Sequence, residues 1–354
     1  MSEGRGSLYV IVQPARYSGV GWISLTWQNQ AVPAPSKKYQ TIDKQVDLLR
    51  TRGLELDGEP ERWLRSVNYY RLSGYWYIYR QIAVSKDGKV GRSDQFEAGT
   101  TFSSITDLYE FDRKLRTLLH DGVERVEVAL RSQVSYVLGA HGPLSYEIPS
   151  TFRDTFDHQG WLSDADRRVT RASRRSPSIQ HHQNQRSGVI PIWVLVDVLD
   201  FSDVSKLFEG MKVSDQYAVA EGLGLHIDLD KVTGNQRNKS LKNHPLARWL
   251  EQLSVVRNIA AHHGRLWNRT VVPAPTAAMK TIDGLEDLPK GQSESIFGAL
   301  AVIAKILQTT SPGSTWAHKV GVLAGQSLDE MPRRSTREMG FPDDWRTTKP
   351  WASR

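Results

Sequence analysis

The chain has 354 residues and a formal net charge of +7, with 46 Lys and Arg residues against 39 Asp and Glu residues. It contains no cysteine, which excludes a disulfide framework, a thiol nucleophile and thiolate metal sites, and favours a reducing, cytoplasmic compartment. The excess of Lys and Arg over Asp and Glu suits a polyanionic partner such as nucleic acid, but composition alone does not identify one.

The first 36 residues mix Gly, Pro and aromatic residues without a helical or strand period. We predict a disordered or poorly packed extension over residues 1–36, followed by a single helical domain over residues 37–351. The short apolar run at residues 8–12 is followed by Pro14 and Arg16, which is unlike a signal peptide. No stretch approaches roughly twenty apolar residues, so we expect no membrane association through a spanning helix.

Apolar residues repeat at helical spacing between Thr41 and Gly53, which predicts a first helix of about three turns. A second helical segment is predicted from about Glu61 into an aromatic string at residues 68–77. Dense aromatic residues at helical spacing fit core packing, but Tyr and Trp rings beside arginines also fit stacking on RNA bases.

The longest periodic stretch runs from Ser104 to Val134 and predicts one long helix, which Gly122 could interrupt and which ends at residues 141–143. Its other face is polar, and we expect it to be solvated or to lie between helices. The charged residues assigned to this face are Asp112, Arg113, Lys114, Arg116, Glu124, Arg125, Glu127 and Arg131.

Residues 164–188 are rich in Arg, Ser, Gln and His and contain almost no apolar residue, so we predict an exposed loop. Helical patterns resume at Ile192. The first predicted segment is 192–208, as one helix or as a pair with a turn near 201–203. The others are 213–223, 245–267, 293–307 and 315–323. Because no alternating strand series and no internal repeat is visible, the predicted fold class is all-α.

The segment 245–267 places a cluster of polar residues within an apolar helical frame. Asn258, His262, Arg265 and Arg269 fall within about 60° of one another, provided that the helix continues past Gly264. Arg257 lies about 140° from His262 on such a helix. The two side chains can therefore meet only if they are long enough to converge, or if a second copy of the helix completes the site. The second possibility points to a two-fold homodimer.

This residue set suits RNA cleavage, which must move a proton off the 2′-hydroxyl, deliver one to the 5′-oxygen and stabilise charge on the phosphorane. Histidine is the usual side chain for proton transfer in enzymes, so His262 suits the proton steps. Arg257 keeps its charge and offers a planar fork to phosphate oxygens. Asn258 could orient His262 or contact a phosphate. The set requires no metal and no cofactor.

Other interpretations of the same residues exist. An Arg-x4-His pair is expected about once by chance in this composition, and Arg175 and His181 form a similar pair in the polar stretch. In the alternative in which these residues are structural, His263 and Arg257 satisfy each other's polar groups in a buried contact of the helix. A metal hydrolase using His262 and His263 fits poorly, because adjacent histidines on a helix point about 100° apart.

The run from Arg257 to Arg269 resembles the signature of the Abi-like (abortive infection) family, whose Arg-x4-6-His motif is that of the HEPN ribonucleases. The resemblance covers residues 37–351, because further stretches resemble other characteristic segments of that family. These stretches are residues 39–54, 68–75, 111–116, 127–131, 191–193 and 340–345. It implies a HEPN-like helical bundle with additional peripheral helices. It also implies a metal-independent endoribonuclease toxin of phage defence, with Arg257 and His262 catalytic and Asn258 in support.

Further residues are expected to bind RNA or to support the pair. They are His263, Arg265, Asn268, Arg269, Glu127, Arg131, Tyr70 and Arg71. The expected partners are the RNA substrate, a second copy of the chain, and a small-RNA or protein antitoxin. The alternative function is a non-catalytic RNA- or protein-binding module in which Arg257 and His262 are structural.

Overall fold

The computed structural model describes residues 38–85 and 88–352. Its contacts divide the chain into two units, residues 1–41 and 42–354, and the described helices and strands all lie in the second. The predicted N-terminal extension, residues 1–36, lies outside the described residues. The described part has thirteen α-helices and two antiparallel two-stranded sheets, which confirms a mostly α-helical fold.

The helices are α1 (Ile42–Thr51), α2 (Pro60–Ser66), α3 (Tyr69–Trp76), α4 (Phe102–Ala140), α5 (His158–Ala172), α6 (Pro177–Gln185), α7 (Ile192–Leu195), α8 (Phe201–Gly210), α9 (Val213–Gly222), α10 (Gly234–Lys242), α11 (Leu246–Ala261), α12 (Ile296–Thr310) and α13 (Trp316–Glu330). The strands are β1 (Arg80–Val84), β2 (Val90–Phe96), β3 (Ala274–Pro275) and β4 (Gln292–Ser293). No helix within the described ranges is both long enough and apolar enough to cross a membrane.

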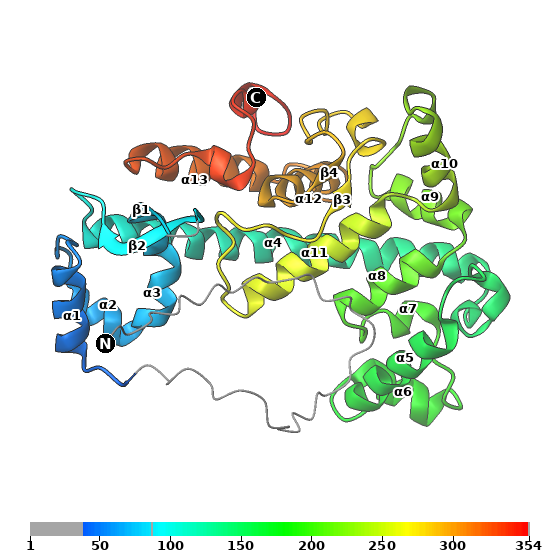
Figure 1. The fold of residues 1–354 in the computed structure, drawn as a ribbon. Coiled ribbons are helices and arrows are strands. Elements are labelled where there is room, and N and C mark those ends of the chain that lie inside the picture. The colour runs from blue at the N-terminus through cyan, green and yellow to red at the C-terminus, as the bar shows by residue number, and fades with distance from the viewer. Residues whose placement is uncertain (1–37, 86–87, 353–354) are drawn as a thin grey trace. The chain divides into compact units, whose positions relative to one another are not determined.

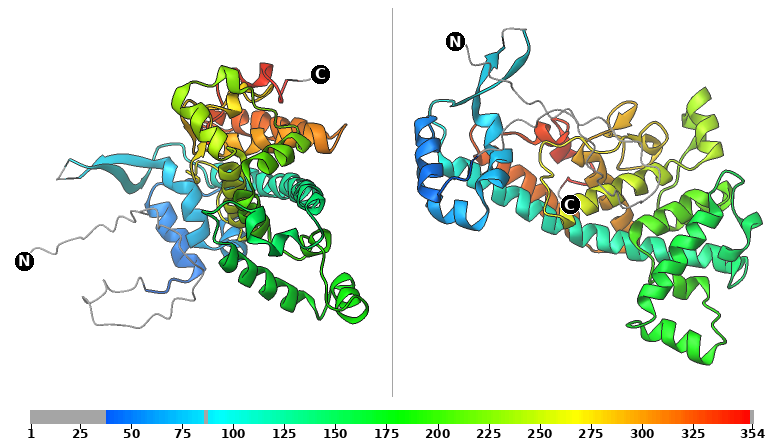
Figure 2. Two further views of the ribbon diagram at one scale, coloured as in Figure 1. Left: turned by 90° about the vertical axis from the view of Figure 1, so that its right-hand side faces the viewer. Right: turned by 60° about the horizontal axis from the view of Figure 1, so that its bottom comes forward.

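Helix α4 is the element that the others pack on. It is 39 residues long and contacts α3, α7, α8, α9, α11, α12 and α13 (Figures 1 and 2). The predicted long helix is confirmed, but Gly122 does not interrupt it. A Cβ at Gly122 would come within 2.6 Å of the Trp316 ring, so the glycine lets α13 pack closely against α4. A long helix with apolar residues at 3.6-residue spacing can bury one stripe against several shorter helices.

The segment predicted from about Glu61 into the aromatic string forms two short helices, α2 and α3, where the sequence predicted one continuous helix. Asn68 has a φ of 69° and separates α2 from α3, and its side-chain oxygen accepts the Arg71 amide at 2.9 Å. After α3 the chain enters the β1–β2 hairpin, which was not predicted. Its apolar residues are largely exposed, so the hairpin lacks the alternation by which a strand is recognised.

Residues 164–188 are not a loop, and that prediction is wrong. The Asp157 side chain caps α5, which buries Trp161 and Ala165 and packs on α8. Ser176 caps α6, which buries Ile179. Side-chain caps and one or two buried apolar residues are enough to stabilise a helix that packs against neighbouring helices on one side.

The remaining predicted helices are present with shifted bounds. The turn placed at residues 201–203 is instead the start of α8, because Asp200 and Asp203 form a capping box there. Helix α10 was not predicted, since only Ser240 of its residues is buried and it has no apolar stripe. Helices α9, α12 and α13 confirm the three segments predicted at 213–223, 293–307 and 315–323.

The start of α11 carries a buried histidine with a consequence for stability. The Nδ1 of His244 accepts the Leu246 amide at 3.1 Å, and burial lowers the pKa of His244 to about 3. Because the unfolded chain binds the extra proton more readily, this stabilisation is present above pH 6.5 and is lost as the pH falls toward 3. From pH 6.5 to pH 5, we expect His244 to lower the free energy of unfolding by about 2 kcal/mol.

Urea denaturation of the wild type and His244→Asn over this pH range measures the effect. The Asn oxygen can accept the Leu246 amide but does not titrate, so the variant should lose about 2 kcal/mol less stability. Equal losses in the two proteins would contradict the prediction.

Candidate functional site

The candidate site lies at the carboxyl end of α11, where the helix stops at Ala261. The His263 amide donates to the Ala260 carbonyl at 2.9 Å, and the Gly264 amide donates to the Ile259 carbonyl at 2.7 Å. These two bonds form a Schellman motif, in which His263 holds the left-handed position with a φ of 56°. The helix therefore does not continue past Gly264, and the predicted stripe joining His262 to Arg265 and Arg269 is wrong.

The chain beyond α11 is held by one buried carboxylate. Oδ1 of Asp112 on α4 accepts the Leu266 and Trp267 amides at 3.0 and 2.7 Å. Its Oδ2 accepts the Tyr75 hydroxyl of α3 at 2.7 Å and pairs with Arg116. Burial raises the pKa of Asp112, whereas the donors and the Arg116 charge favour the ionised form. Asp112 thus joins α3, α4 and the end of α11.

Arg265 and its neighbours lie beside this network. The Arg265 side chain donates to the Gly74 carbonyl, and its guanidinium lies 5.7 Å from the centre of the Trp267 ring. Burial lowers the pKa of Arg265. Arg269 donates to the Arg265 carbonyl at 3.4 Å, and Asn268 is exposed with a φ of 46°. Arg265 therefore stabilises the packing of the segment after α11 against α3. Asn268 and Arg269 lie at the surface beside it.

Arg257 lies against α4. Its Nη1 donates to the Asn258 side chain at 3.2 Å, and its Nη2 lies 4.0 Å from Oε2 of Glu127. Glu127 also pairs with Arg131, which donates to the Leu199 carbonyl at 2.8 Å. The structure therefore brings four of the sequence-predicted residues into one group, and it does so without His263. The alternative in which Arg257 and His263 satisfy one another is wrong.

The two histidines lie on the accessible side of the same helix end. His262 and His263 are both exposed, and within the described residues neither side chain has a hydrogen bond or ion pair. Arg71 of α3 donates to the His263 carbonyl at 2.6 Å, which ties the aromatic string to the site. Tyr70 is 89% exposed and does not line a pocket with them, while Tyr75, Trp76 and Tyr79 are core residues.

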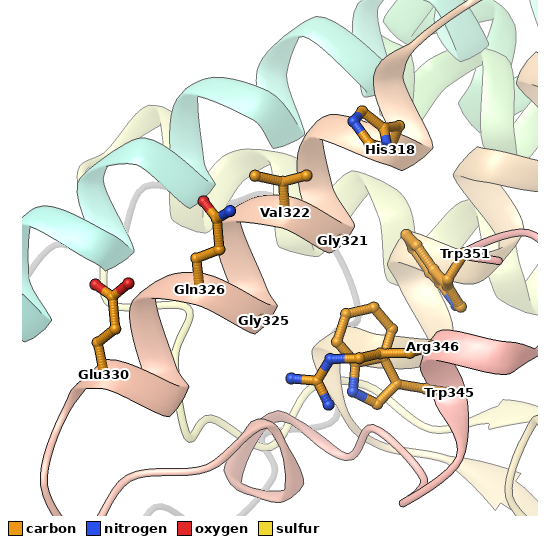
Figure 3. A pocket seen from close by; sticks show the side chains of 9 residues that line it. All are labelled: His318, Gly321, Val322, Gly325, Gln326, Glu330, Trp345, Arg346 and Trp351. Carbon is orange, nitrogen blue, oxygen red and sulfur yellow. The ribbon is translucent and has the colours of Figure 1, made fainter. Parts of the chain in front are cut away.

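No metal site is evident among these residues. Across the described ranges, no group of three or more His, Asp or Glu side chains could hold a metal ion. A pocket of about 330 Å³ lies elsewhere, between α13 and the C-terminal Trp345 and Trp351 (Figure 3). None of the sequence-predicted site residues lines it.

Asp112 and Arg116 were assigned to a polar face, yet they are buried, with exposed fractions of 0% and 5%. Asp112 lies four residues from Leu108 and from Arg116, and three from Leu115, so it falls on the apolar stripe of α4. An acid and an arginine spaced i, i+4 within an apolar stripe was the signal that could have identified this buried pair.

Removal of the Asp112 charge tests this network. Asp112→Asn keeps an acceptor for the Leu266 and Trp267 amides but leaves the buried Arg116 charge without its partner. We expect the free energy of unfolding, measured in urea, to fall by about 3–5 kcal/mol. The matched control is Asp121→Asn, because Asp121 pairs with Arg125 on the same helix at a site about 40% exposed. It should cost less than about 1 kcal/mol, and a similar cost for both variants would refute a special role of Asp112.

The left-handed conformation of His263 should be strained. An L-residue pays about 1–2 kcal/mol there, and glycine pays only its larger backbone entropy. His263→Gly should therefore raise the free energy of unfolding by about 1 kcal/mol in thermal or urea denaturation. His262→Gly, at an ordinary φ of −89°, should lower it instead. A loss of stability in His263→Gly would show that this side chain stabilises the fold.

A family model described as Abi-like protein matches residues 62–268. The match begins within α2, ends after α11 and includes Asp112, Glu127, Arg257 and His262. The resembling stretches at residues 39–54 and 340–345 lie outside it. No curated protein and no solved structure matches the chain. Since the matched region is more than half of the sequence, the chain belongs to the Abi-like family, which is associated with abortive infection and phage defence.

Proposed function

We propose that the chain is a metal-independent endoribonuclease of the HEPN type, in which Arg257 and His262 cut RNA during abortive infection. The observation that carries the proposal is the placement of this pair at the accessible end of α11, inside the family match. The His262 side chain is exposed and, within the described part of the chain, unbonded, so it is available to a substrate. Arg257 is partly exposed and already oriented.

The proposed reaction is a transesterification. His262 takes the proton of a 2′-hydroxyl as that oxygen forms a bond to the adjacent phosphorus, and the bond from phosphorus to the 5′-oxygen breaks. The 5′-oxygen takes up a proton, so the products carry a 2′,3′-cyclic phosphate and a 5′-hydroxyl. Arg257 stabilises the charge that develops on the phosphorane. Glu127 and Asn258 hold the Arg257 guanidinium, which reduces the entropy lost when it binds the transition state.

A second copy of the chain would complete this chemistry. On an ideal helix Arg257 and His262 would lie about 140° apart, and His262 is the residue at which α11 ends, so we expect that one copy does not direct both side chains to the same point. In a two-fold dimer, the second His262 would donate the proton to the 5′-oxygen. A toxin of this kind also needs restraint, for which we propose a small-RNA or protein antitoxin. Cytoplasmic localisation follows from an RNA substrate and belongs to the same proposal.

The alternative is a module that binds RNA or protein without cutting. The basic groups around His263 would serve either function, so the discriminating feature is whether His262 is required for chemistry or only for binding. The next experiment separates these functions through the ends of the RNA fragments.

Purified protein is incubated with total RNA in EDTA, beside His262→Ala and the control His226→Ala, which removes a histidine whose side chain is 82% exposed. We expect cyclic-phosphate ends from the wild type and the control, and a rate at least about 100-fold lower for His262→Ala. Circular dichroism and RNA affinity should be equal in all three. Intact RNA in every sample, or equal cutting by His262→Ala, would reject Arg257 and His262 as a catalytic pair.

A further inference from the structure

A pocket lies beside the end of α11, and the proposed reaction does not use it. It has a volume of about 640 Å³ and is formed by the turn between α2 and α3, the middle of α4 and the last turn of α11. None of its lining residues is a carboxylate. Its basic lining residues are Arg71, Arg113, Arg116, His120 and His263.

Arg116 is the fixed part of this pocket. It is 95% buried, since its exposed fraction is 5%, and its hydrogen bonds to the residues that the structure describes all use Nη1. Its partner Asp112 already accepts bonds from Tyr75, Leu266 and Trp267. The remaining N–H groups of Arg116 therefore lack a protein acceptor among the described residues, and a planar guanidinium with open donors suits a phosphate.

The other two arginines of the pocket likewise donate hydrogen bonds from one nitrogen each, and their remaining N–H groups are available to a ligand. Arg71 donates from Nη1 to the His263 carbonyl, and Arg113 donates from Nε to Glu110 at 2.8 Å. The imidazoles of His120 and His263 make no hydrogen bond within the described part of the chain. Three guanidinium groups are thus offset by only two carboxylates, Glu110 and Asp112, neither of which lines the pocket. This excess of positive charge attracts an anion.

The pocket also has features of a nucleotide site. Tyr109 lines it with an aromatic ring that is partly exposed, and the Arg116 guanidinium lies 5.8 Å from the centre of that ring. Its volume lies within the range typical of small-molecule sites, about 300–1,000 Å³. His263, which lines the pocket, is adjacent in sequence to His262. We therefore expect a strand that presents its 2′-hydroxyl to His262 to lie close to this opening.

We infer that this pocket binds a nucleotide phosphate of the RNA strand that flanks the cleaved bond. The inference rests on the proposed ribonuclease function, and it identifies where the substrate is held. Arg113, about half exposed, can be replaced without disturbing the buried network. Because the pocket binds the strand in the ground state and the transition state alike, loss of an arginine there should raise KM and leave kcat unchanged.

The test uses a short fluorescein-labelled oligoribonucleotide whose 2′-oxygens are all methylated, so that it binds but cannot be cut. Fluorescence anisotropy is measured over a range of potassium chloride concentrations for Arg113→Gln and for Arg125→Gln. Arg125 is the matched control, because it lies on the same helix with a similar exposure but outside the pocket. We expect Arg113→Gln to bind about three- to tenfold more weakly, with a salt slope lower by about 0.7, and Arg125→Gln to bind as the wild type does.

Equal weakening of binding in both variants would overturn the inference, because only net charge would then matter. Wild-type affinity in Arg113→Gln would overturn it as well. Calorimetry with adenosine monophosphate distinguishes a free nucleotide from a strand. If Arg113→Gln loses the mononucleotide but keeps the oligoribonucleotide, the strand-binding inference is wrong. The non-cleavable probe reports on the pocket even if His262→Ala proves fully active, so failure of the proposed function and failure of the pocket can be distinguished.

Discussion

The site depends on one buried carboxylate. Asp112 accepts donors from α3, from α4 itself and from two successive amides after α11, so three segments distant in sequence meet at a single side chain. Burial of an ion costs several kcal/mol unless its lone pairs are satisfied, and here each oxygen has two donors. The arrangement of donors is therefore specific. The chain leaving α11 must return to α4 at this point, and that return fixes where the helix end and its histidines lie.

The end of α11 is shaped by the same requirement. A Schellman motif turns the backbone sharply, and Gly264 is suited to it because a Cβ there would lie 3.0 Å from the Ile259 carbonyl oxygen. The preceding residue is in the left-handed region, where glycine is usual, yet it is His263. Strained residues that persist in a fold tend to gather at functional sites, so the conformation of His263 supports the proposed function. Its carbonyl is fixed by Arg71, so the turn also orders α3 beside the site.

The sequence predicted the elements that carry strong helical periodicity, and it failed where other interactions decide. Helices α1, α4 and α11 were found from apolar spacing, but α5 and α6 depend on caps and a few buried residues, and the hairpin has no alternating pattern. The proposed stripe failed because one residue, His263, adopts a conformation that its type disfavours. Asp112 was missed because charged residues are read as surface residues. The group of Arg257, Asn258, Glu127 and Arg131 did assemble, since both helices were placed correctly.

The last turn of α11 separates two surroundings of different charge. Beside Arg257 lies Glu127, which offsets part of its charge. Beside His263 lie three guanidinium groups with no carboxylate lining the pocket. Under the proposed function, an RNA strand is attracted most strongly to the pocket, where three arginines outnumber their two carboxylate partners and neither carboxylate lines the pocket. Arg257, whose charge is already partly balanced, responds mainly to the additional charge of the phosphorane. Strand binding and transition-state stabilisation would then rest on different arginines, so that either can change in strength without the other.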